Sequence, residues 1–162
     1  MFEIGDKIFY PMHGAGIVEA IEEKEILGEK QLYYILQMPL NNMQVMIPKA
    51  KISNLNIRGL VDSETMDTAL ASFQNERPEE PAVIPSQRYR HLMNKLKSGD
   101  IFEGVDVIRD LTQLSREKTL GNEDRSMLDN AQQLLISELV LSRDIEQERA
   151  EQLLSQALQK QA

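Results

Sequence analysis

The 162-residue chain contains no cysteine and no tryptophan. Without cysteine it can form no disulfide, no thiolate nucleophile and no cysteine-ligated metal site. No stretch approaches the roughly 20 apolar residues that cross a bilayer. The opening MFEIGDKIFY includes acids and holds no uninterrupted apolar run, unlike a secretory signal peptide. We therefore expect a soluble, cytoplasmic protein with no membrane attachment.

Basic residues are also scarce, because 18 lysines and arginines face 26 acids and leave a formal net charge of −8. A protein that binds DNA on its own is usually basic, since neutralising phosphates supplies much of the affinity. Strong autonomous DNA binding is therefore not expected. With 41% hydrophobic and 27% charged residues, the composition predicts a folded globular protein. The length suits one ordinary domain or two small ones.

Patterns that carry out catalysis or hold a cofactor are missing as well. The two histidines, His13 and His91, belong to different predicted domains and have no acids at metal-ligand spacing. His13 lies in a predicted strand-to-strand turn, residues 11–16, which favours a structural role. The glycines of this turn lack the lysine and the following helix of a phosphate-binding loop, and no nucleophile elbow is present. We predict no catalytic residue, no metal site and no cofactor, and hence a protein that is not an enzyme.

The first 58 residues predict a small β-domain. Short alternating runs are separated by turn residues such as Pro11, Gly14, Gly28 and Pro39. They suggest five strands at residues 7–10, 16–21, 22–26, 31–36 and 43–47. Five short strands with tight turns favour a closed or nearly closed barrel, which limits exposed edges. Tyr33 and Tyr34 point to opposite faces of their strand, which argues against the aromatic cage of a methyl-lysine reader.

The strand at residues 43–47 carries a candidate contact residue. If Val45 and Ile47 fill the barrel, Met46 points outward, because side chains alternate along a strand. An exposed methionine suits an irregular protein partner. Plain core packing explains the same pattern equally well, so both interpretations remain open.

Residues 59–83 predict a short helix, at 65–73, followed by an acidic linker. The stretch from Arg77 to Pro81 contains two prolines and is a poor helix former. Residues 84–162 then predict four helices in a compact bundle. Gly99 suits the left-handed end of the first helix, and Asp100 can cap the next one with Glu103 three residues on. The predicted fold class is α+β, with a five-stranded β-barrel and an all-α helical bundle as two domains.

The first helix of this bundle is the most basic stretch of the chain. At 100° per residue, Arg88 and Lys95 fall on one flank of its apolar stripe, and Arg90 and Lys97 on the other. Further bases could join them in the folded domain: Arg109, Arg116, Lys118 and Arg125. A solvent-exposed helix edge and a local contact with the DNA backbone explain this cluster equally well.

Several short motifs in order along the chain resemble the CarD family, and most closely its short, two-domain CarD/CdnL members. No single motif is specific, but the ordered set covers nearly the whole chain, including the linker and the helix breaks. The motifs are Gly5-Asp6-Lys7, Tyr10-Pro11-Met12-His13-Gly14, Val45-Met46-Ile47-Pro48, Arg88-Tyr89, Lys95-Leu96-Lys97-Ser98-Gly99-Asp100 and Arg109-Asp110-Leu111.

The resemblance implies a Tudor-like (SH3-like) barrel, related to the polymerase-interacting domain of transcription-repair coupling factor. Such a barrel binds the lobe of the RNA polymerase β subunit, and Leu36, Met46 and Pro48 match contact or contact-supporting positions. The helical domain is implied to lie against promoter DNA at the upstream edge of the transcription bubble and to modulate open-complex stability. Arg88, Arg90 and Arg125 match its DNA-facing positions. The alternative is an adaptor that binds polymerase with little or no DNA contact. In either case we expect the protein to be a monomer.

One departure from the family pattern concerns this DNA contact. Many members carry a tryptophan that wedges into the upstream fork, just before a Ser-Arg-Arg-Tyr-type segment. Pro85 stands there in this chain, and Gln87 replaces a frequent base. Proline acts as an apolar minor-groove wedge in some architectural proteins, but it offers no aromatic plane. Pro85 therefore remains a candidate DNA contact whose mechanism differs from that of tryptophan.

Overall fold

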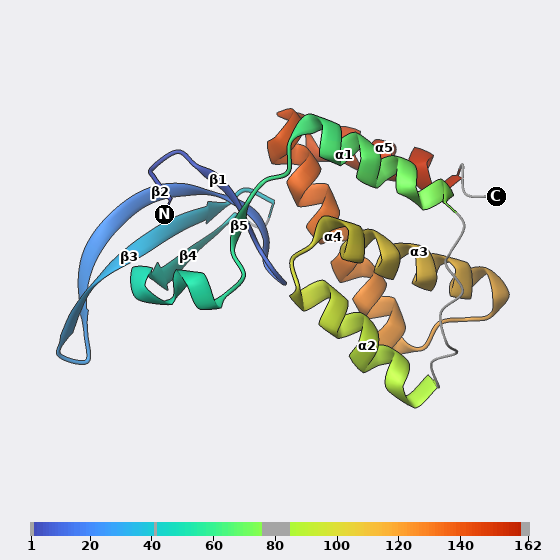
Figure 1. Cartoon of the computed structure of the whole chain (residues 1–162), viewed down its shortest axis with the longest axis horizontal. Coiled ribbons are helices and arrows are strands. Elements are labelled where there is room, and N and C mark those ends of the chain that lie inside the picture. Colours follow the sequence, from blue (N-terminus) through green and yellow to red (C-terminus); the bar gives the residue numbers. More distant parts are fainter. Residues whose placement is uncertain (1, 41, 76–84, 160–162) are drawn as a thin grey trace.

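The computed structural model of the chain describes residues 2–40, 42–75 and 85–159. In this part of the chain a curved antiparallel sheet lies beside a group of helices (Figure 1). The sheet has the order β4-β3-β2-β1-β5, so that β4 and β5 form its edges. Its strands are β1 (Lys7–Tyr10), β2 (Gly14–Ile26), β3 (Glu29–Met38), β4 (Met43–Pro48) and β5 (Arg58–Gly59).

One face of the sheet encloses a small hydrophobic core. Tyr34 and Leu36 of β3 point into it together with Ile47 of β4, while Tyr33 and Ile35 lie on the opposite face. The 3-10 helix η1 (Lys49–Asn54) follows β4 and packs its Ile52 against the same core. This segment covers the core between β4 and β5, which are not neighbours in the sheet order. The result is the predicted five-stranded, barrel-like domain.

The strand assignment differs from the prediction at one place. Residues 16–21 and 22–26 were expected as two strands, but both belong to β2, and the fifth strand is β5. The register of β2 against β3 shifts between Val18 and Ala20. Such a bulge bends a strand without ending it, so one long strand can serve two parts of a curved sheet.

The hairpin between β2 and β3 ends in a strained two-residue turn. Leu27 and Gly28 connect the paired residues Ile26 and Glu29, and both have positive φ, 53° and 81°. Positive φ at both central positions defines a type I′ turn, which Asn-Gly fits best. Leu27 is 99% exposed, so its side chain gains no packing that would offset the left-handed backbone.

We expect Leu27→Asn to raise the free energy of unfolding by about 1 kcal/mol, because asparagine tolerates the left-handed region better than leucine. Urea denaturation followed by circular dichroism measures this change. Leu27→Ala is the matched control. It removes the exposed apolar side chain but keeps a Cβ, which is sterically unfavourable at positive φ. Equal stabilisation by both substitutions would show that backbone strain at Leu27 is not the cause.

The helical part shares one hydrophobic core. Buried members come from every helix, among them Phe73, Leu92, Ile108, Leu139 and Leu154. Asp100 caps the third helix as predicted, accepting hydrogen bonds from the backbone N–H groups of Phe102 and Glu103. The elements are α1 (Ser63–Ala71), η2 (Ser72–Gln74), α2 (Pro85–Lys97), α3 (Ile101–Glu117), α4 (Asn122–Arg143) and α5 (Gln147–Gln159).

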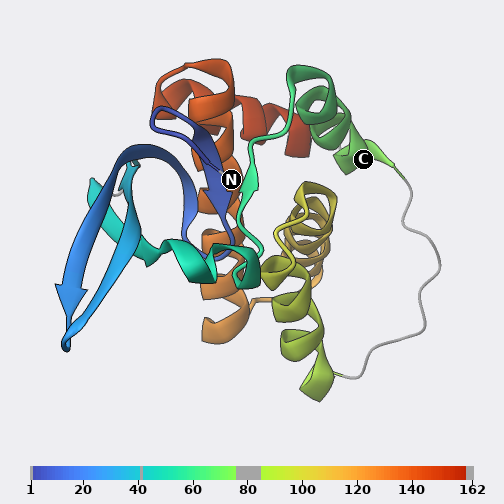
Figure 2. The ribbon, with the colours of Figure 1, turned by 60° about the vertical axis from the view of Figure 1, so that its left-hand side comes forward.

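The helices α1 and η2 belong to this core rather than to a linker. Met66, Ala69 and Phe73 are fully buried among residues of the other helices, and Figure 2 shows α1 beside α5 on the helical side of the molecule. Asp62 caps α1, and its hydrogen bonds with the side chain and backbone of Thr65 lower the pKa of its carboxyl group. The chain therefore crosses between the domains near residues 59–62.

The acidic linker predicted at residues 77–81 lies outside the described residues. The elements on either side of it, η2 and α2, both contribute to the helical core. We therefore propose that the linker connects two parts of the helical domain rather than the two domains, and the division at residues 59–83 stays a prediction. The physical reason for this placement is that the apolar side chains of α1 pack against the later helices.

After proteolytic cleavage in this segment, the two fragments should therefore remain associated. With a site-specific protease sequence placed at residues 77–83, we expect the two cleaved fragments to co-elute in size-exclusion chromatography under native conditions. They should separate only in denaturant, which serves as the control. Elution of the N-terminal fragment apart from the helices in native buffer would contradict the packing of α1.

Candidate interaction surfaces

The outward face of β4 presents an exposed methionine. Met46 is 43% exposed, whereas Ile47 lies in the core and Val45 packs against it. Met46 pairs in register with Ile35 of β3. Next to it, the side-chain amide of Gln44 donates to Glu19 at 3.1 Å, so a polar rim borders the methionine. An exposed methionine on an edge strand can contact a protein partner, because its flexible side chain adapts to irregular surfaces.

The other two predicted contact residues lie beneath or beside this face. Leu36 is only 1% exposed and pairs with Val45, so it shapes the strand from inside and has no surface of its own to offer a partner. Pro48 is half-buried, lies opposite Tyr33, and ends β4 where η1 begins. Met46 is therefore the exposed member of this set, whereas Pro48 is half-buried and Leu36 is buried.

The two basic flanks of α2 have different surroundings. Arg88 donates to Asp124 of α4 at 2.6 Å, and Lys95 lies 3.6 Å from Asp106 of α3. These side chains are largely covered by the neighbouring helices. Arg90 and Lys97, on the opposite flank, are exposed. A DNA backbone could thus approach the flank that carries Arg90, while the Arg88 flank holds the bundle together.

The Arg88–Asp124 ion pair also brings Arg125 to the same end of the bundle. Arg125 is exposed in the first turn of α4, one residue after Asp124, and its guanidinium donates to the carbonyl of Leu120 at 3.3 Å. Pro85 is the first residue of α2, but its side chain lies outside the described part. Arg90 and Arg125 are consequently the two predicted DNA contacts that are exposed here.

Arg109 is buried, contrary to the idea that it extends the basic surface. It is 6% exposed, donates to Asp106 at 2.6 Å and to the carbonyl of Ser72 at 3.2 Å. Its role is to tie α3 to the end of α1. Helical periodicity alone does not show this, because the acceptor belongs to a segment 37 residues away.

Two family models match the chain: residues 2–61 match the CarD-like/TRCF RID domain, and residues 68–155 match the C-terminal domain of CarD. A Bacillus subtilis (strain 168) protein described as "Putative transcription factor YdeB" is 49% identical over 146 residues, which make up 90% of this chain and 94% of that protein. The chain belongs to the CarD family. The solution NMR structure of the N-terminal domain of Myxococcus xanthus CarD is 29% identical, covers 36% of this chain and 79% of that one, and has a TM-score of 0.32.

The two candidate surfaces of this CarD-family chain fall in different matched ranges. Met46 lies in the range of the CarD-like/TRCF RID domain, and Arg90 and Arg125 lie in that of the CarD C-terminal domain. A partner bound at Met46 would thus leave the exposed arginines to a second partner.

The histidines and acids of this CarD-family protein are its candidate metal ligands. No group of three or more histidines and acids among the described residues is placed to hold a metal ion. His13 lies in the turn after β1, where its ring centre is 4.2 Å from that of Tyr10 with the rings tilted by 43°, and its backbone N–H donates to the Tyr10 carbonyl. Across the described ranges, no helix is long and apolar enough to span a membrane.

Proposed function

We propose that this protein is a transcription regulator that binds the β subunit of RNA polymerase through its N-terminal sheet domain. The match of residues 2–61 to the CarD-like/TRCF RID domain carries the proposal. The exposed Met46 on the edge strand β4 supports it, because an edge strand with an apolar centre can receive a partner by packing and by strand addition.

The second half of the proposal is contact with promoter DNA at the upstream edge of the transcription bubble. Arg90 and Arg125 supply the phosphate contacts, and Arg88 holds the start of α2 against α4. Two exposed arginines on a chain of net charge −8 bind DNA weakly alone. Binding to polymerase raises their effective concentration beside the DNA, so they need not supply the affinity.

Stabilising one state of the promoter requires a difference in affinity between the states. The helical domain can provide this difference if Arg90 and Arg125 reach the upstream DNA only in the open complex. We therefore propose that the protein modulates the stability of the open complex. In this proposal the protein acts by binding and catalyses no reaction.

An adaptor that binds polymerase without DNA contact is the second candidate. It is favoured by the net charge and by the internal pairing of Arg88, Lys95 and Arg109. The absence of tryptophan, with Pro85 at the family's wedge position, points the same way.

Photo-cross-linking in the full chain separates the two candidates. A photoreactive amino acid at position 46 should cross-link to the β subunit, and one at position 125 should cross-link to promoter DNA only when polymerase is present. Exposed Glu148 on α5 is the control position and should give neither product. A β cross-link without a DNA cross-link would support the adaptor, and no β cross-link would overturn the proposal.

A further inference from the structure

The two domains meet in a built interface rather than through a bare linker. The turn after β1 inserts Pro11, which is buried, and Met12, which packs against the helical core. Beyond the turn, the buried backbone N–H of Ala15 donates to the Ser137 hydroxyl of α4 at 2.9 Å. A Cβ on Gly14 would lie 2.9 Å from that hydroxyl oxygen, so the backbone of β2 approaches α4 as closely as glycine permits. Such close approach restricts sliding of one domain over the other.

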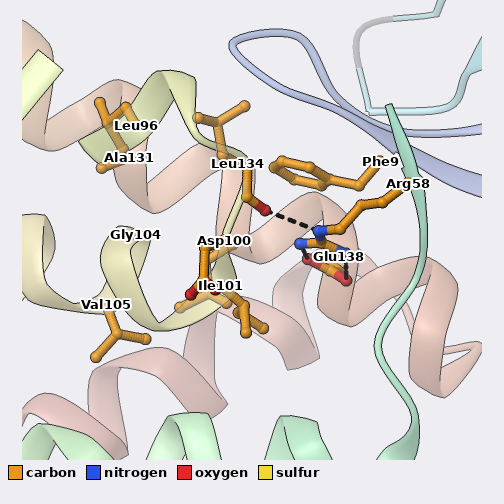
Figure 3. A pocket seen from close by; sticks show the side chains of 12 residues that line it. Phe9, Arg58, Leu96, Asp100, Ile101, Gly104, Val105, Ala131, Leu134 and Glu138 are labelled. Atoms are coloured by element: carbon orange, nitrogen blue, oxygen red, sulfur yellow. Dashed lines mark hydrogen bonds and ion pairs between the residues drawn. The ribbon is translucent and has the colours of Figure 1, made fainter. Parts of the chain in front are cut away.

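Arg58 of β5 connects this interface to three separate elements. Its guanidinium forms a bidentate pair with Glu138 of α4, with both distances at 2.8 Å. Its Nε donates to the Gly99 carbonyl, in the turn between α2 and α3, at 2.7 Å. The same guanidinium lies 4.5 Å from the ring centre of Phe9 in β1. Figure 3 shows the Arg58 guanidinium facing the Glu138 carboxylate, with the Phe9 ring beside it.

Glu138 is 1% exposed and accepts a third hydrogen bond, from the backbone N–H of Val61 at 3.0 Å. A buried carboxylate is costly unless it is paired and hydrogen-bonded. Well-packed apolar residues often replace a buried ion pair without loss of stability, so stability alone is a weak reason for its presence. A bidentate pair, unlike an apolar contact, specifies direction as well as proximity.

The small cavity beside this pair does not suggest a ligand. Its volume is about 30 Å³, and its lining includes Phe9, Arg58, Leu134 and Glu138. This volume accommodates water but not an organic molecule. The polar contacts of Arg58 therefore serve the interface itself.

We propose that Arg58 and Glu138 are positioning residues: their interdomain ion pair sets the orientation of the helical domain relative to the sheet domain. This inference rests on the proposed function, in which Met46 binds polymerase and Arg90 and Arg125 contact DNA. When the ion pair fixes this orientation, a protein bound to polymerase through Met46 presents Arg90 and Arg125 to one place on the DNA. With the pair removed, the arginines sample many places, and their effective concentration at the DNA falls.

The test compares the wild type with Arg58→Ala/Glu138→Gln, which removes the pair without leaving a buried unpaired charge. Because the chain has no cysteine, spin labels can be placed at Glu23→Cys in β2 and Asp129→Cys in α4, both exposed positions. Double electron–electron resonance should give a narrow distance distribution for the wild type and a broad one for the variant. In unlabelled protein, polymerase affinity should be unchanged, and the effect on open-complex lifetime should fall about 10-fold, as expected from a lower effective concentration.

Arg143→Ala is the matched control, because Arg143 pairs with Asp67 within the helical domain and its loss should change neither readout. If the double variant does not fold, Arg58→Lys replaces it, since lysine lacks the planar fork that reaches Glu138 and Gly99 together. An unchanged distance distribution would overturn the inference, as would a broad distribution with full regulatory effect. Failure of the wild type to bind polymerase would overturn the proposed function instead, while the distances would still decide the role of the ion pair.

Discussion

Met46→Asp is expected to weaken binding to RNA polymerase by at least about 100-fold. A carboxylate at this position would lose its water against an apolar partner surface, which costs several kcal/mol, and each 1.4 kcal/mol is about tenfold in affinity. The 43% exposure of Met46 means that the free protein keeps this carboxylate hydrated. The substitution should therefore leave the fold intact while it removes the interaction.

Met43→Asp provides the matched control for this prediction. It introduces the same charge on the same strand. Met43 is 52% exposed, but it lies on the same face of β4 as Val45 and Ile47, opposite to Met46. Affinity for core polymerase can be measured by biolayer interferometry, with circular dichroism as the check of folding. Equal affinity losses for the two variants, or an unchanged affinity for a folded Met46→Asp, would remove the outward face of β4 from the interface.

Glu138→Ala is expected to lower the free energy of unfolding by about 3 kcal/mol, near the lower end of the range for breaking a buried ion pair. The loss removes three hydrogen bonds and leaves the guanidinium of Arg58 without its carboxylate. The value stays near the lower end because the Arg58 side chain is 26% exposed and water can reach it.

Urea denaturation of Glu138→Ala and Arg143→Ala measures this difference. Arg143 pairs with Asp67, whose side chain is 67% exposed, so its removal should change stability by no more than about 1 kcal/mol. Stability losses of similar size in the two variants would show that the interdomain pair contributes no more than a surface pair.

Much of the fold follows from local patterns in the sequence. The alternation of Val45, Met46 and Ile47 predicts that Met46 points outward if the other two fill the core, because a strand has a period of two. Gly99 and Asp100 predict the break between α2 and α3, because a left-handed end and a capping carboxylate are local requirements. These features depend on residues that are close together along the chain, and the structure confirms them.

The rest depends on contacts between distant residues. Periodicity places Arg88 and Arg90 on two flanks of α2, but the ion pair with Asp124, 36 residues away, decides which flank is covered. Glu138 interrupts an apolar run in α4, and that interruption is the local signal in the sequence that this charge is buried. Its partner Arg58 lies 80 residues earlier, and no local pattern connects the two.

The lifetime of open complexes on a ribosomal-type promoter, with and without the protein, tests the proposed function most directly. We predict that the wild type changes this lifetime and that Arg90→Ala/Arg125→Ala abolishes the change while it binds polymerase normally. The effect of the wild type should weaken as salt is raised, because the contacts are with phosphates. The control Arg143→Ala/Arg149→Ala removes two positive charges from α4 and α5, as many as Arg90→Ala/Arg125→Ala removes, and should behave like the wild type. Full activity of the Arg90→Ala/Arg125→Ala protein would contradict a DNA contact by the helical domain.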